Sequence, residues 1–134
     1  MKQFTGLLLA SGILLAASST AAQSVIRPGD RVRGSLGESD RTLADGSRYD
    51  CFNLRAGAGE RISITLRSGE FDPFLSVMEG ANCANPVATE TDDDSGGGSD
   101  ARLEMTLGSG PYSFRANAYR AGQGGAYELV VERR

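Results

Sequence analysis

Apolar and polar residues alternate with a period of two along most of the chain from Arg31 onward. The segment Arg61–Arg67 is the clearest example, because Ile62, Ile64 and Leu66 alternate with charged or hydroxyl residues. Such alternation, interrupted at short intervals by glycine, is typical of antiparallel strands that bury one face. No stretch after the first 22 residues shows a helical period of apolar positions, so the pattern predicts an all-β domain.

The alternation predicts about eight short strands. They are Arg31–Leu36, Tyr49–Leu54, Arg61–Arg67, Phe74–Met78, Val87–Thr91, Arg102–Leu107, Tyr112–Ala118 and Tyr127–Val131. Regularly spaced short strands with turn residues between them are typical of a sandwich or a barrel. Because each strand has one polar face, we expect two sheets packed face to face, each with its other face in water.

The first residues of the chain have the pattern of a secretory signal peptide. Lys2 supplies a positive charge, residues 7–17 are apolar, and small residues follow up to Ala22. The apolar stretch is shorter than the roughly 20 residues that span a bilayer, so we predict a cleaved signal rather than a membrane anchor. We expect residues 1–22 to be removed, with cleavage after Ala21 as the alternative. Residues 23–30 would form a short leader, and residues 31–134 the domain.

Composition narrows the possible functions. The 134 residues include no histidine, so Ser-His-Asp and Cys-His catalytic sites and His-ligated zinc are excluded. The formal charge is −3, and removal of the signal peptide with Lys2 would leave 13 arginines against 17 carboxylates. This balance argues against a nucleic-acid-binding protein. The arginines are scattered along the sequence, and we expect them to lie on solvated strand faces.

Export changes the interpretation of the two cysteines, Cys51 and Cys83. In an oxidising compartment they are expected to form a disulfide, and two free thiols are the alternative. Cys51 has the opposite parity to Phe52 and Leu54 along its strand. It is therefore expected to point outward and to reach Cys83 across a loop.

The most unusual segment is the acidic, glycine-rich stretch 92–100. It contains Asp92, Asp93, Asp94 and Asp100. Clustered carboxylates in a flexible loop are typical ligands of calcium, which takes six to eight oxygen atoms. The stretch fits neither an EF-hand nor a repeated calcium-binding motif. A solvated turn built from Asp, Ser and Gly is the alternative interpretation.

Several short motifs occur in a characteristic order. They are Gly34-Ser-Leu, Tyr49-Asp-Cys-Phe, Ala56-Gly-Ala-Gly-Glu-Arg-Ile, Phe71-Asp-Pro-Phe-Leu, the acidic loop with Ala101-Arg-Leu, Gly110-Pro-Tyr and Gly125-Ala-Tyr-Glu-Leu. This ordered set resembles the bacterial pre-peptidase C-terminal domain. The resemblance covers about residues 30–132.

The resemblance implies a jelly-roll-like antiparallel β-sandwich that is not itself catalytic. Domains of this family commonly follow a secreted protease, and some bind collagen or calcium. Asp72 precedes Pro73, so we expect it to accept backbone N–H groups in a turn, with calcium binding as its second possible role. Calcium is the candidate cofactor, and its predicted ligands are Asp92, Asp93, Asp94, Asp100 and Asp72.

Three functions remain for comparison with the structure. The first is an exported, non-catalytic binding or accessory module, secreted or periplasmic in a bacterium, with an unknown macromolecular partner at the cell envelope or outside. The second is a peptidase-associated inhibitor or chaperone-like module, which needs an exposed rigid loop such as Ala81–Pro86. The third is a carboxylate-based glycoside hydrolase using Asp72 and Asp94.

Overall fold

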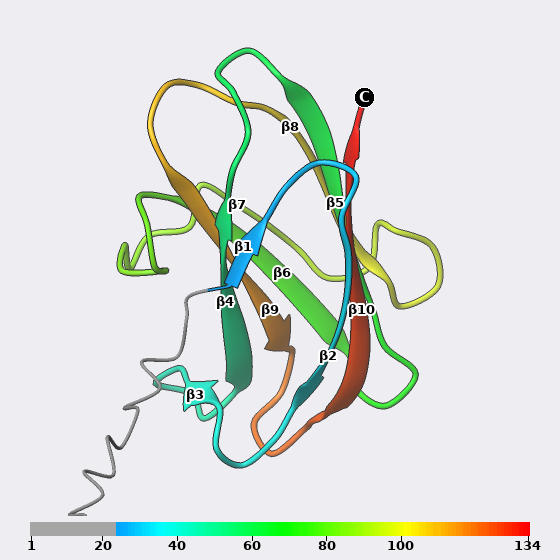
Figure 1. The fold of residues 1–134 in the computed structure, drawn as a ribbon. Helices are drawn as coiled ribbons and strands as arrows, with labels where there is room; N and C mark the ends of the chain where they lie inside the picture. The colour runs from blue at the N-terminus through cyan, green and yellow to red at the C-terminus, as the bar shows by residue number, and fades with distance from the viewer. Residues whose placement is uncertain (1–23) are drawn as a thin grey trace, which may run out of the picture.

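The structure is a computed structural model and describes residues 24–134. Ten strands form two sheets that face each other (Figure 1). This confirms the all-β sandwich but not the predicted number of about eight strands. The described part of the chain contains no helix capable of crossing a membrane. The predicted signal peptide, residues 1–22, lies outside the described residues.

The first sheet has six strands in the order β1-β4-β9-β6-β7, with β3 paired to the side of β4. Its members are β1 (Ser24–Ile26), β3 (Arg41–Thr42), β4 (Arg48–Leu54), β6 (Pro73–Glu79), β7 (Glu90–Asp92) and β9 (Tyr112–Ala118). The pairing of β1 with β4 is parallel, and the other pairings in this sheet are antiparallel.

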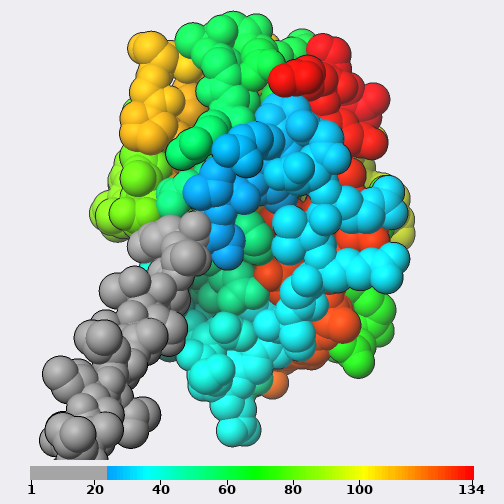
Figure 2. Space-filling view, viewed as in Figure 1, coloured from blue at the N-terminus to red at the C-terminus, as the bar shows by residue number. Residues whose placement is uncertain are grey.

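The second sheet has four antiparallel strands in the order β2-β10-β5-β8. They are β2 (Arg31–Leu36), β5 (Arg61–Arg67), β8 (Ala101–Thr106) and β10 (Gly125–Arg133). The chain changes sheets between β1 and β2, and Figure 2 shows this N-terminal segment in blue on the surface of the sandwich.

Two of the ten strands were not predicted. The segment expected to be a leader contributes β1, and Ile26 at its end is fully buried in the core. Arg41–Thr42 adds the two-residue strand β3 at the edge of β4. Both strands are too short to show alternation, so a periodic pattern could not identify them. The strand expected at Val87–Thr91 is β7, Glu90–Asp92, and Val87 lies outside it with 68% of its surface exposed.

The core lies between the sheets and is formed by the alternating apolar residues. Ile62, Ile64 and Leu66 have no exposed surface, as the alternation predicts. The outer face of the four-stranded sheet is only partly wet, however, because exposed arginines surround buried residues at its middle. Ser63 and Thr65 on the opposite face of β5 are only 1% and 6% exposed. Other side chains therefore cover the outside of the sheet as well.

Candidate functional site

The acidic loop connects β7 to β8 and is closed by its own hydrogen bonds. The carboxylate of Asp92 accepts the backbone N–H groups of Ser95 at 3.0 Å and Arg102 at 2.8 Å, and also the Ser95 hydroxyl. At the far end of the loop the Gly96 N–H donates to the Asp100 carbonyl, and the Asp100 N–H donates to the Gly97 carbonyl. Asp92 therefore holds the two ends of the loop together, a structural role that its position before a turn explains.

Local backbone geometry explains why glycines occupy this loop. Gly97 and Gly98 have φ angles of 97° and 59°, which residues with a Cβ rarely adopt. A Cβ on Gly96 would lie 2.9 Å from the Cβ of Asp100. The turn chemistry thus accounts for the glycines without any ligand.

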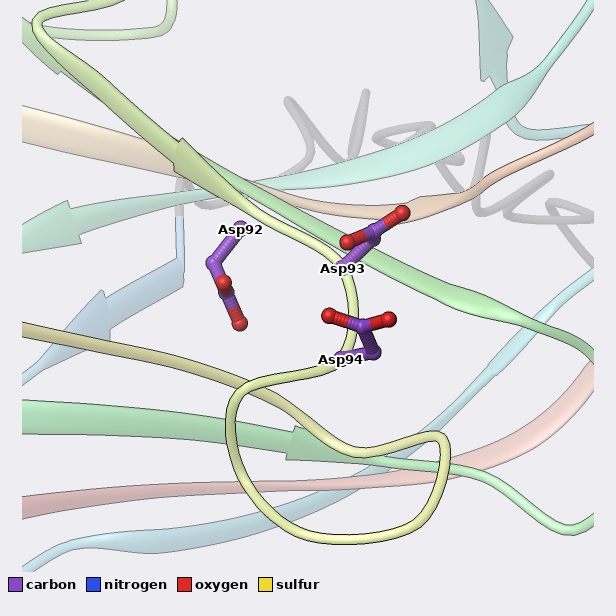
Figure 3. Close-up of side chains that lie close together, drawn as sticks. All are labelled: Asp92, Asp93 and Asp94. Carbon is purple, nitrogen blue, oxygen red and sulfur yellow. The ribbon is translucent and has the colours of Figure 1, made fainter.

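The structure brings three of the five predicted calcium ligands together. One carboxylate oxygen from each of Asp92, Asp93 and Asp94 lies within 4.8 Å of the others. Figure 3 shows the three side chains leaving the start of the loop close to one another. Asp94 is exposed, and the neighbouring charge of Asp93 raises the pKa of its carboxyl. A bound cation would relieve this repulsion between the two carboxylates.

The other two predicted ligands lie outside this group of three. Asp100 pairs with Arg67 on β5, with 3.1 Å between the Arg67 Nε and the carboxylate. Asp72 lies near enough to contribute to the raised pKa of Asp94, and its backbone carbonyl accepts the N–H of Tyr119 at 2.8 Å. The charge of Asp93 is the largest cause of the raised pKa of Asp94. In a glycosidase, the pKa of the catalytic acid is instead usually raised by an apolar pocket.

The second candidate feature is the loop that follows β6. Cys51 and Cys83 form a disulfide, with 6.1 Å between their Cα atoms. Cys51 is paired with Arg115 on the outer face of its sheet, which confirms the outward orientation expected from its parity. The Cys83 N–H also donates to the hydroxyl of Ser113 at 2.9 Å. The loop is therefore fixed to the outside of the six-stranded sheet.

Asparagine side chains fix the same loop at further points. Asn82 and Asn53 exchange two hydrogen bonds of 2.9 and 2.7 Å. Asn85 bonds to the Glu79 carbonyl and accepts the N–H of Val87. The result is a rigid loop that presents Val87 to solvent. Sequence reasoning identified residues 81–86 as the candidate loop but not these asparagine contacts, which depend on the pairing of distant strands.

These features define a two-sheet sandwich with a rigid outer loop and an acidic turn. No family model and no curated protein matches the chain. Among solved structures, one similar fold is the pre-peptidase C-terminal domain of a collagenase from Bacillus anthracis. The TM-score is 0.60 and the identity 17%, and the match covers 82% of this chain and 94% of that one. The predicted resemblance is thus confirmed at the level of the fold.

A second similar structure is PliG of Aeromonas hydrophila, a periplasmic inhibitor of g-type lysozyme. Its TM-score is 0.55 and its identity 15%, and the match covers 84% of this chain and all of that one. Fold does not determine function at such identities. Both neighbours show only that the architecture occurs in a peptidase-associated domain and in an inhibitor.

Proposed function

We propose that the protein is an exported, non-catalytic β-sandwich module that binds a protein partner. The observation that carries the proposal is the rigid, exposed loop from Ala81 to Val87, fixed by the Cys51–Cys83 disulfide and by asparagine hydrogen bonds. A loop that is already ordered loses little conformational entropy on binding. The disulfide also supports a location of the protein in an oxidising compartment, either outside the cell or in the periplasm.

The fold of a lysozyme inhibitor suggests the first partner to test. The experiment measures lysis of bacterial cell walls by a g-type lysozyme at increasing concentrations of the purified protein. Inhibition that Val87→Ser weakens would support an inhibitory loop. Val25→Ser is the matched control, because Val25 is also an exposed valine but lies on β1.

If the protein does not inhibit lysozyme, binding of another protein partner through the loop can be tested directly. The wild-type protein and the two valine variants would be immobilised and exposed to envelope extract. A partner retained by wild type and Val25→Ser but lost with Val87→Ser would support binding through the loop. Equal retention by all three proteins would contradict it.

We also propose that a calcium ion stabilises the acidic loop, which the clustering of Asp92, Asp93 and Asp94 supports. The test is thermal unfolding with excess calcium and with chelator. A ligand at a hundred times its dissociation constant adds about 2.7 kcal/mol to the free energy of unfolding, which corresponds to about ten degrees for a domain of this size. Asp94→Asn should abolish the shift, and Glu38→Gln, at another exposed carboxylate, should retain it. The absence of a shift would make the loop a solvated turn.

A further inference from the structure

Folding gathers arginines that are scattered along the sequence onto one surface. This surface is the outer face of the sheet β2-β10-β5-β8, called here the arginine face. Six arginines lie on it, and they are Arg31, Arg33, Arg61, Arg67, Arg102 and Arg134. The arginines were expected on solvated strand faces, but the sequence does not show that six of them share one face, because sequence distance does not reveal which strands become neighbours.

The six arginines form two clusters, each around one glutamate. Glu128 forms ion pairs with Arg31, Arg33 and Arg67, with N–O distances of 3.4 to 3.6 Å. Three guanidiniums bring about fifteen N–H donors to a carboxylate with about four acceptor positions. Most donors in the cluster are therefore left for water or for a partner.

The second cluster surrounds Glu104, which contacts Arg61, Arg102 and Arg134 at 2.9 to 3.7 Å. The hydrogen bond from Arg102, with the nearby charge of Arg61, holds the pKa of Glu104 below its usual range. Glu104 thus stays ionised and keeps the three guanidiniums in place.

The middle of the arginine face is covered by side chains, although the arginines around it are partly exposed. Ser63, Thr65 and Val130 point to this face, yet none is more than 9% exposed. Long apolar stems that cover a surface while their charged ends remain wet are characteristic of arginine. The side-chain exposures of Arg33 and Arg31 are still 82% and 59%. The guanidiniums are thus held in an ordered layer that remains accessible.

Charge is distributed unevenly over the described residues. The arginine face carries six arginines and four carboxylates, namely Asp100, Glu104, Glu128 and Glu132, whereas the rest of the domain carries seven arginines and thirteen carboxylates. One face is thus net positive on a molecule that is otherwise acidic. A hollow of about 420 Å³ opens at one end of this face, between Arg33 and Arg67.

We propose that the arginine face binds an acidic segment of a partner protein. Guanidinium groups match carboxylates in geometry as well as in charge. The four carboxylates on the face would repel a uniformly charged polymer, whereas a protein can place carboxylates over arginines and neutral groups over glutamates. The surface lies on the opposite side of the sandwich from the Ala81–Val87 loop, so it is a second contact beyond that loop.

The test uses a labelled twelve-residue peptide of alternating Glu and Ser, with fluorescence anisotropy at low and at physiological salt. A Lys-Ser peptide of the same length and heparin are the comparison ligands. The Glu-Ser peptide should bind more tightly than both, and its binding should weaken with salt. Failure of the Glu-Ser peptide to bind at low salt would overturn the proposal, and so would tighter binding of heparin, which would indicate a sulfated polysaccharide.

Matched variants separate a local effect from a general effect of net charge. Arg33→Gln/Arg67→Gln removes two charges from the face, and Arg41→Gln/Arg120→Gln removes two exposed charges elsewhere. We expect the first pair to weaken peptide binding about fivefold to tenfold, the sum of two exposed ionic contacts, and the second pair less than twofold. Equal losses would contradict a binding surface. Neither pair touches the Ala81–Val87 loop, so failure here leaves the loop proposal intact.

Discussion

The hydroxyl of Tyr127 on β10 donates a hydrogen bond of 2.5 Å to the carboxylate of Asp50 on β4, and this bond joins the two sheets. Burial is the main cause that raises the pKa of Asp50, to about 6, and the charge of Asp40 adds to it. Burial, together with Asp50, also raises the pKa of Tyr127, so the phenol remains a donor. Tyr127 thus stabilises the charged form of a partly buried carboxylate, while burial and Asp40 oppose it.

Replacing Tyr127 with phenylalanine is predicted to destabilise the fold by about 1–3 kcal/mol, because a partly buried acceptor loses its donor. The pKa of Asp50 should rise further, since the tyrosine hydrogen bond opposes the effect of burial. Urea unfolding at pH 7 measures the first effect. Tyr119→Phe is the control, because Tyr119 is 45% exposed, and it should change the stability by less than about 0.5 kcal/mol.

The raised pKa of Asp50 predicts how stability depends on pH. The unfolded carboxyl titrates near its model value of 3.8 and the folded one near 6, so the folded state binds more protons between these values. Stability should therefore fall as the pH rises from about 4 to about 6, by about 1 kcal/mol after allowance for solvent screening. The measurement compares urea unfolding across this range with that of Asp50→Asn. An unchanged slope in the variant would assign the dependence to other carboxyls.

A glycine opposite Tyr127 makes room for this hydrogen bond. Gly34 is paired with Tyr127 in the register of β2 and β10, and a Cβ on Gly34 would lie 2.4 Å from the tyrosine oxygen. Gly34→Ala should therefore displace the ring and cost about 1–3 kcal/mol, as overpacking does. Gly37→Ala is the control, because a Cβ there meets nothing within 4 Å. Equal melting temperatures for the two variants would show that the ring adjusts without cost.

Features that follow from residues within one strand could be predicted from the sequence, whereas contacts between segments far apart in the chain could not. The burial of Ile64 follows from alternation within one strand and was predictable. The strand that ends at Ile26 is short and gains its burial from β4, so no local pattern identifies it. The same reason applies to Tyr127 and Asp50, which are 77 residues apart in the chain.

The candidate sites also differ in whether their residues are neighbours in the sequence or meet only through strand pairing. Asp92, Asp93 and Asp94 are consecutive, so their proximity is evident from the sequence alone. The partner of Asp100 is Arg67, and that contact requires β5 and β8 to be neighbours. The arginine face depends on the order of four strands. Strand parity gave the correct side for Arg61 and Arg67, but only the sheet order shows that the six arginines meet.

The disulfide provides a prediction about the stability of the whole sandwich. Cys51 and Cys83 are 32 residues apart, and a crosslink that closes a loop of this length stabilises by about 3–4 kcal/mol in the chain-entropy model. Cys51→Ala/Cys83→Ala should lower the free energy of unfolding by this amount, measured in urea without reductant. Dithiothreitol should destabilise the wild type to a similar degree and leave the double variant unchanged. A response of the double variant to reductant would show that the effect does not come from the disulfide.

Asp92 and Asp93 are adjacent, but their replacement is predicted to affect two different properties of the loop. Asp92→Asn weakens the acceptor for the Ser95 and Arg102 amides, so these two N–H groups should lose protection from hydrogen exchange. Asp93→Asn instead removes the charge that contributes most to the raised pKa of Asp94. In calcium-free buffer the pKa of Asp94 should then fall towards its usual value, which carboxyl NMR titration measures. A pKa of Asp94 that stays raised in Asp93→Asn would contradict the assigned cause and would leave burial and the more distant Asp92 and Asp72 to account for it.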